Sequence, residues 1–400
     1  MGTPELPPPQ ARRILDLART DRAAARLAMA EHGLQAQVAL VCETPARRRA
    51  ELLAVAPEPE RLIPALPPAE LCFTALAVGL DDAGWILEHA GAEQMTACVD
   101  LDAWHQGLPD RARLGGWLVA FADAGEEALL RAARAVDFEA WTLHLMDRIE
   151  VVLKPSGDED WTPPTGGLTL DGQFYALPRK EGDDLEELTD LLRVLFQKDY
   201  WFYFRLLQSV VWELPSETEE WARRWRGGRL EDLGFPPLGE AKALYSFMGD
   251  HELRALPSEE RPWRLSEWPL PVWMPNLPAS TEADSALFRA FAALPEGDRR
   301  PFLLEFLTVA NRLAVADDLP LGEAETLPTA LAKAARFASL GIEYLSAEHG
   351  ESAATILLRV SQERLFQVGF NLERAAGRAE PPPLPPDPEE EAAAEATDEE

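Results

Sequence analysis

The chain has 400 residues, 46% of them hydrophobic, and a formal net charge of −31 at pH 7. This length predicts two or three domains or an extended helical array, because one ordinary core does not hold 400 residues. The charge argues against nucleic acid and anionic membrane surfaces as partners, and no apolar run is long enough to span a bilayer. With no signal-peptide pattern in "MGTPELPPPQ", we expect a cytoplasmic protein without membrane insertion.

Residues 1–153 are expected to form an N-terminal array of short helices. Leu-Pro steps recur along the chain, and proline both stops one helix and suits the first turn of the next. The arginines of "PARRRAELL" make this region locally basic, which favours solvated helix faces. Three cysteines in apolar helical contexts are expected to be buried free thiols of a reducing compartment. They are Cys42, Cys72 and Cys98.

Residues 154–279 are expected to form a middle domain. "LTLDGQFYAL" predicts a small β-hairpin near 168–177, because Asp171-Gly172 suits a type I′ turn. A long helix is predicted over 183–213, followed by one that starts at the capping box of Ser216 and stops at Gly227-Gly228. Residues 257–279 read as an extended Trp- and Pro-rich connector. Its tryptophans are the candidate partner-binding residues: Trp263, Trp268 and Trp273.

The five consecutive aromatic residues from Tyr200 to Phe204 lie within the long predicted helix. Phe202, Tyr203 and the following leucines form a stripe at helical spacing, whereas Trp201, Phe204 and Trp212 fall on the other side. A helix that is apolar on both sides is normally buried between layers, so a core role is favoured. An exposed docking patch is the alternative. The charged run that follows, from Glu219 to Arg226, reads as helix-surface support by i,i+4 pairs, with an anion site as the alternative.

Residues 280–378 are expected to form a C-terminal helical domain, with helices at 281–294, 298–317 and 323–374. The last is expected to be interrupted, because Pro328, Gly341 and Gly350 fall inside it. Residues 379–400 are proline-rich and then acidic without Lys or Arg, which is typical of a disordered tail. The predicted fold class is therefore all-α, an irregular helical array, with the one small hairpin near 168–177.

Motifs that carry chemistry are missing from the sequence: it has no HExxH, CxxC, GxSxG, GxGxxG or phosphate-binding loop. Asp102 and His105 could share a helix face beside Asp100, but a metal site would need further ligands, so structural roles are favoured. We expect no cofactor, no metal and no catalytic residue, and the sequence leans against an enzyme.

The pattern "WELPSE…RWR.GRL.DLGF" within residues 206–245 resembles a bacterial family described as domain of unknown function number 6178. "AEQM….VDLDAW" at 92–104, "LGIEYLS" and "RLFQVGFNL" resemble the same family, and the similarity spans roughly 50–375. That family implies no activity and no catalytic residues. The short helices of the first half also resemble, in pattern, the superhelical cytosolic domain of bacterial magnesium transporters, in which acidic residues bind metal.

These observations favour a non-catalytic cytoplasmic scaffold or adaptor that binds protein partners, because helical arrays offer extended surfaces without a chemical motif. One alternative is a regulatory module that responds to divalent metal through its acidic surface. Another is an enzyme of unrecognised type with a site at a domain junction, where carboxylates or His105 would converge. The identity of the partner and the oligomeric state are left open by the sequence.

Overall fold

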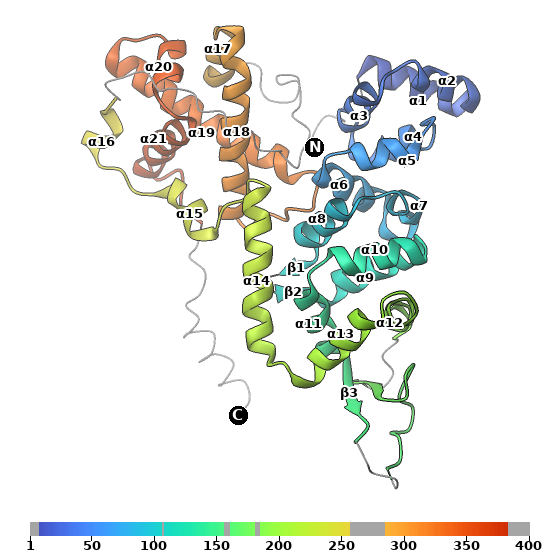
Figure 1. Ribbon diagram of the computed structural model, residues 1–400. Helices are drawn as coiled ribbons and strands as arrows, with labels where there is room; N and C mark the ends of the chain where they lie inside the picture. Colours follow the sequence, from blue (N-terminus) through green and yellow to red (C-terminus); the bar gives the residue numbers. More distant parts are fainter. Residues whose placement is uncertain (1–7, 106–107, 156–160, 181–184, 257–284, 383–400) are drawn as a thin grey trace. The chain divides into compact units, whose positions relative to one another are not determined.

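The computed structural model describes residues 8–105, 108–155, 161–180, 185–256 and 285–382 (Figure 1). The chain divides into two compact units. The first contains Met1–Phe235, Ser266–Ser280 and Pro320–Pro328, and the second contains Pro236–Leu265, Thr281–Leu319 and Thr329–Glu400. The predicted division at 153, 279 and 378 remains a prediction, and the predicted tail lies mostly outside the described residues.

The fold class is confirmed as mainly α-helical, with two short antiparallel strand pairs in the described residues. The first unit begins with a succession of short helices. They are α1 (Pro9–Thr20), α2 (Arg22–Ala30), α3 (Leu34–Cys42), α4 (Ala46–Leu53), α5 (Pro59–Leu62), α6 (Pro68–Val78), α7 (Gly84–Leu87), α8 (Ala92–Asp102), α9 (Arg111–Asp123), α10 (Glu126–Ala135) and α11 (Phe138–Arg148), with 3-10 turns η1 (Ile63–Ala65) and η2 (Leu80–Asp82).

Arginines of the basic N-terminal region have structural partners. Arg22 and Arg26 donate hydrogen bonds to the carbonyl oxygens of Ala54 and Pro57. Arg49 is buried and forms a 2.5 Å ion pair with Glu70, and it also donates to three backbone carbonyls. The prediction of solvated faces is therefore wrong for Arg49, whose charge helps to join α4 to α6.

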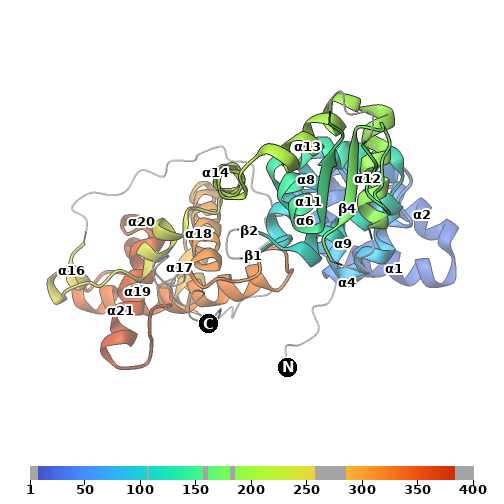
Figure 2. The ribbon, with the colours of Figure 1, turned by 90° about the horizontal axis from the view of Figure 1, so that it is seen from below.

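The predicted hairpin near 168–177 is represented by one bridge, between Leu168 and Ala176, across a turn in which Gly172 has a φ of +70°. Its second strand, β4 (Phe174–Pro178), pairs along its length with β3 (Ile149–Leu153), a segment that the sequence placed in a helix. The other pair, β1 (Trp104–His105) with β2 (Leu108–Pro109), is shorter. In Figure 2 the β3–β4 pair lies beside the helices that follow it in the chain.

The predicted helix over 183–213 is two helices, α12 (Glu186–Lys198) and α13 (Tyr200–Trp212). They separate at Asp199, whose carboxylate accepts a hydrogen bond from the backbone N–H of Phe202 and so caps α13. The next helix, α14 (Pro215–Asp232), starts with proline and without a side-chain cap, and continues through Gly227-Gly228. The predicted capping box and the predicted stop are therefore wrong.

The regular elements in the described residues of the second unit are all helices. Its elements are α15 (Leu238–Lys242), η3 (Ala243–Tyr245), α16 (Asp250–Arg254), α17 (Ala286–Ala292), α18 (Glu296–Ala316), α19 (Thr326–His349, its first residues in the first unit), α20 (Ala353–Arg359) and α21 (Gln362–Ala375). Aromatic rings fill its core: Phe337, Phe366, Phe370 and Tyr245 pack edge to face at centroid distances between 4.8 and 5.7 Å.

Two glycines explain how α19 and α21 cross. A methyl group at Gly341 would overlap the carbonyl oxygen of Leu365, and one at Gly369 would overlap that of Phe337. The two backbones therefore approach more closely than any side chain allows. The predicted stretch 323–374 is interrupted, as expected, and one break follows α19 at Gly350, which has a φ of +64°. Pro328 and Gly341, which were expected to contribute to the interruption, lie within α19.

Within the described residues, no single helix has the length and apolar character needed to cross a membrane. Pro59–Ala65 and Pro68–Val78 meet that requirement only when taken together, and they are bent by 116°.

Candidate functional site

Large apolar side chains that remain exposed identify the candidate site. The tryptophans predicted to bind a partner, Trp263, Trp268 and Trp273, lie outside the described residues. The structure instead exposes apolar side chains along two consecutive helices, α13 and α14. We call this set the α13–α14 apolar surface: Trp201, Trp212, Leu214, Trp221 and Trp225.

α13 is buried on one side only. Tyr203, Leu206 and Leu207 are buried, whereas Trp201 is 72% and Trp212 67% exposed. The two tryptophans are eleven residues apart, which is close to three full helical turns, so they lie on the same side of the helix. The core interpretation of the aromatic run is therefore correct for Tyr203 and wrong for Trp201, and the alternative of an exposed patch describes the other side.

α14 carries a second apolar stripe. Leu214, Trp221 and Trp225 are spaced by seven and four residues, which brings them to one flank of the helix. The indole rings of Trp221 and Trp225 stack at a centroid distance of 5.9 Å with 22° between their planes. The guanidinium of Arg224 lies 5.4 Å from the centre of the Trp221 ring, so a cation covers part of the stack.

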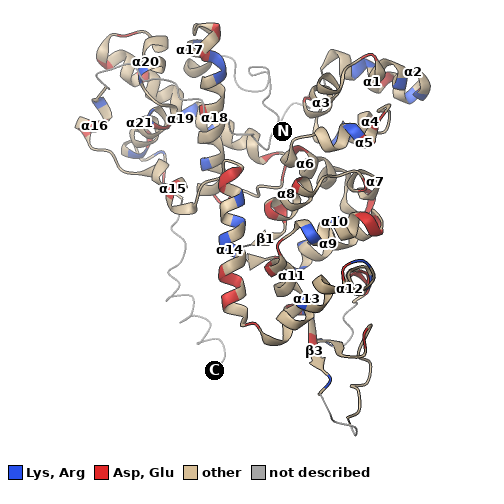
Figure 3. Cartoon of the chain, viewed as in Figure 1, with Lys and Arg blue, Asp and Glu red and all other residues tan. Residues whose placement is uncertain are grey.

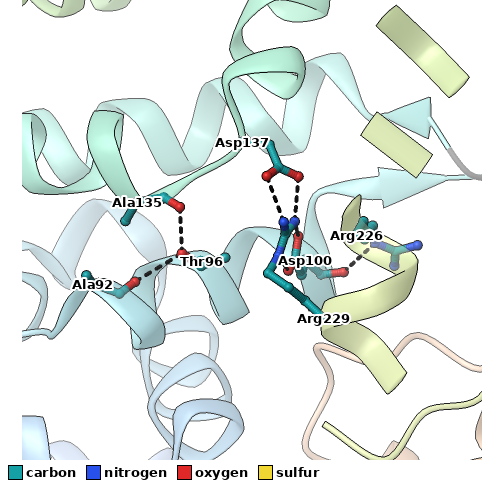
Figure 4. A network of polar contacts seen from close by, with 7 residues as sticks. All are labelled: Ala92, Thr96, Asp100, Ala135, Asp137, Arg226 and Arg229. Atoms are coloured by element: carbon teal, nitrogen blue, oxygen red, sulfur yellow. Dashed lines mark hydrogen bonds and ion pairs between the residues drawn. The ribbon is translucent and has the colours of Figure 1, made fainter. Parts of the chain in front are cut away.

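A partly buried ionic cluster holds α14 against the rest of the first unit (Figure 4). Arg229 donates hydrogen bonds to both carboxylate oxygens of Asp100 on α8, at 2.7 and 2.9 Å. It also donates to both oxygens of Asp137 at the start of α11, at 2.7 and 2.6 Å. All four carboxylate oxygens are thus occupied by one guanidinium, and α14 is fixed to two helices at once.

A neighbouring arginine strengthens this attachment. Arg226 donates from Nε to the carbonyl oxygen of Asp100 at 2.9 Å, and its guanidinium lies 4.9 Å from the centre of the Trp104 ring. Burial lowers the pKa of Arg226 to about 10. Burial also raises the pKa of Asp100, a shift that the hydrogen bonds from Arg229 oppose. The two carboxylates keep the pKa of Arg229 above its usual value despite burial.

The carboxylates that precede His105 in the sequence have hydrogen-bond partners on other elements. Asp102 accepts hydrogen bonds from Arg113 and from the indole N–H of Trp117, at 2.8 and 2.9 Å, and Asp100 belongs to the ionic cluster. His105 lies on β1 with its side chain exposed. Among the described residues, the structure holds no group of three or more His, Cys, Asp or Glu side chains that could bind a metal ion.

Two hollows on the surface of the described residues were considered as sites for a small molecule. One, of about 290 Å³, lies along α10 and contains Glu127, Arg131 and Arg134. Its arginines already have partners, since Arg131 donates to the carbonyl of Glu88 and Arg134 pairs with Asp199 at 2.7 Å. The other, of about 440 Å³, lies in the second unit around Ser346 and has Glu343 as its carboxylate. Each hollow is lined by a single carboxylate and neither by His105, whereas an enzyme site was expected to hold converging carboxylates or His105.

Comparison with known proteins identifies a family. Residues 27–379 match the model of the family of unknown function DUF6178, a longer match than the resemblance in sequence suggested. No curated protein and no solved structure matches the chain. The likeness to the magnesium-transporter domain is not supported by any of these comparisons.

Proposed function

The chain belongs to the DUF6178 family, whose description assigns no activity, and we propose that it is a non-catalytic cytoplasmic scaffold or adaptor. In this proposal, a protein partner binds the α13–α14 apolar surface. The helical array supports this surface, and the ionic cluster around Arg229 fixes α14, the helix that carries Trp221 and Trp225, to α8 and α11.

The observation that carries the proposal is the exposure of four tryptophans on two consecutive helices. Single exposed apolar side chains are ordinary on protein surfaces, but several large ones on adjacent elements are typical of interaction sites. Tryptophan and arginine are also the residue types most enriched among those that dominate binding energies. Trp201, Trp212, Trp221 and Trp225, with Arg224 against one of the rings, match that composition.

The test is affinity capture from the native host, with light crosslinking and mass spectrometry. Two variants interrupt the surface, Trp201→Ser/Trp212→Ser and Trp221→Ser/Trp225→Ser, and thermal unfolding verifies that each is folded. Leu27→Ser and Phe247→Ser serve as matched controls, because these side chains are 71% and 74% exposed on other helices or loops. We expect a stoichiometric partner with the natural chain and the controls, and its loss with either tryptophan variant.

The proposal fails if the captured proteins are the same for the natural chain and both tryptophan variants. A parallel variant, Trp263→Ser/Trp268→Ser/Trp273→Ser, tests the predicted connector separately. Loss of the partner with that variant alone would move the docking site from α13–α14 to the connector.

A further inference from the structure

α14 has a nearly balanced charge, with five carboxylates and four arginines, but most of its arginines do not face outward. Arg226 and Arg229 are turned toward the first unit, where they belong to the ionic cluster. Arg223 pairs with Glu219 at 3.7 Å, on the side of the helix away from the stacked tryptophans. Of the four arginines on α14, only Arg224 therefore lies beside the apolar stripe.

Carboxylates border the apolar stripe on this outward side. At about 100° of rotation per residue, four of them lie within about 100° of Trp221 around the helix axis. All four are exposed: Glu217, Glu220, Glu231 and Asp232. Figure 3 shows acidic positions toward both ends of α14, with basic positions between them. The arginines on the outward sides of α14 and α13, Arg224 and Arg205, offset only part of this charge, so the border of the stripe is negative overall.

We propose that the stripe of Leu214, Trp221 and Trp225 binds a basic amphipathic helix of a protein partner. The stripe extends over eleven residues, about 16 Å along the helix axis, which matches about three turns of a partner helix. The apolar face of that helix covers the indoles, and its Lys or Arg side chains reach the four carboxylates. The inference rests on the proposed function, because it requires the α13–α14 apolar surface to be a docking surface, and it names the chemistry of the partner.

Charge complementarity favours a basic partner over a neutral or acidic one. Opposite charges at the border of an interface orient the partner and speed its association, whereas like charges in contact oppose binding. The net charge of −31 on the whole chain acts in the same direction, since it attracts a basic segment and repels an acidic one. The indoles add a second attraction for cations. Arg224 already lies 5.4 Å from the centre of the Trp221 ring, and the half-exposed ring of Trp225 offers a similar contact to a partner.

The experiment measures fluorescence anisotropy of a labelled model peptide mixed with the full chain in 0.15 M NaCl. The probe is an amphipathic helical peptide of about 18 leucines and lysines. One comparison peptide has glutamate in place of lysine, and another has the same composition as the probe in an order without an apolar face. We expect the probe to bind in the micromolar range, because the stripe is smaller than the roughly 800 Å² per partner of a stable interface. Both comparison peptides should bind at least tenfold more weakly.

Variants of the chain locate the binding. The border variant neutralises the four carboxylates: Glu217→Gln/Glu220→Gln/Glu231→Gln/Asp232→Asn. The matched control removes the same charge from four exposed positions on or beside other helices: Glu31→Gln/Glu60→Gln/Glu93→Gln/Glu126→Gln. We expect the border variant and Trp221→Ser/Trp225→Ser each to weaken binding at least tenfold, and the control to change it less than twofold. Tenfold is about 1.4 kcal/mol, which is ordinary for four exposed ion pairs together. Circular dichroism verifies that every variant remains helical.

Several results would overturn the inference. The natural chain could fail to bind the probe, or it could bind the glutamate peptide as tightly. Equal weakening by the border variant and the matched control would mean that the probe responds to net charge and not to the stripe. If any of these results occurs while the tryptophan variants still lose a captured partner from the host, the docking surface stands and its partner is not a basic helix. If capture is also unaffected, both proposals fall.

Discussion

His144 should make the first unit unstable in acid. It lies on α11 with 3% of its surface exposed, and neither ring nitrogen has a hydrogen-bond partner among the described residues. Burial lowers its pKa to about 3, and the positive charges of Arg148 and Arg111 add to that shift. Folding therefore keeps the imidazole neutral at a pH where an unfolded chain would protonate it.

The sign and size of the effect follow from proton linkage. An unfolded histidine has a pKa near 6.5, so below that pH the unfolded state binds a proton that the folded state does not. The stability is fully present above pH 6.5 and is lost as the pH falls toward the folded value. Relative to pH 8, the loss is about 0.8 kcal/mol at pH 6 and about 2 kcal/mol at pH 5. The value at pH 5 changes little if the folded pKa is 4 instead of 3.

Urea unfolding at several pH values, followed by tryptophan fluorescence, measures this loss. Nine of the twelve tryptophans lie in described residues of the first unit, so most of the signal reports on the unit that contains His144. His144→Leu removes the titrating group, and His105→Gln is the matched control because His105 is exposed. The stability difference between the natural chain and His144→Leu should shift by about 2 kcal/mol between pH 8 and pH 5. The control should show no such shift.

Parallel pH profiles for the natural chain and His144→Leu would refute the reasoning. They would mean that His144 reaches water or a hydrogen-bond acceptor in the folded state, so that burial does not keep it neutral. The quantity to compare is the difference in free energy of unfolding between the natural chain and His144→Leu at each pH. The total free energy of unfolding also depends on pH through other groups, because burial raises the pKa of Asp100 and the hydrogen bond from Arg48 lowers that of Glu51.

Other predictions test the packing and the ionic cluster. Gly341→Ala and Gly369→Ala should each destabilise the second unit by about 2 kcal/mol through overlap with a backbone oxygen, whereas Gly297→Ala, which has open space, should be neutral or stabilising in thermal unfolding. Arg229→Met should cost about 3 kcal/mol in urea unfolding, because it leaves two carboxylates without their partner, and Asp100→Asn/Asp137→Asn should restore part of that loss. The buried thiols of Cys42, Cys72 and Cys98 should resist iodoacetamide in the native protein and react once urea unfolds the chain. Burial raises the pKa of Cys42, and a hydrogen bond with Cys98 together with burial raises the pKa of Cys72. Rapid labelling of the native protein would contradict this prediction.

Local signals in the sequence predict the helical class and many boundaries, and two further local signals indicate features that differ from the predictions. Asp199 precedes the aromatic run and is a preferred N-cap residue, so the break between α12 and α13 was visible in principle. "IEVVL" at 149–153 is rich in β-branched residues, as expected of the strand β3. Apolar residues at helical spacing nevertheless favoured a continuous helix over both segments. In the folded chain, tertiary contacts determine where each helix ends and which segment forms a strand.

Other features depend on contacts that no local pattern contains. Asp100 and Arg229 are 129 residues apart, and nothing near either residue indicates that the two will meet. From the sequence, Gly341 is predicted to interrupt its helix. The need for glycine at this position comes instead from the close approach of the Leu365 carbonyl oxygen on α21, which no local pattern shows. Exposure of Trp201 could not be predicted either, since it depends on which side of α13 the neighbouring helices cover.

The segments that resemble the family meet in pairs in the folded chain. "VDLDAW" contributes Asp100 and "RWR.GRL" contributes Arg229 to one cluster, and Gly341 of "LGIEYLS" crosses beside Gly369 of "RLFQVGFNL". Packing therefore explains these two pairs of residues. Trp225 belongs to the same stretch as Arg229, yet its side chain is 49% exposed and stacks on Trp221 at the surface. Contacts within the first unit account for the presence of an arginine at position 229, but they do not account for a half-exposed tryptophan at position 225. We therefore expect Trp225 to contact another molecule.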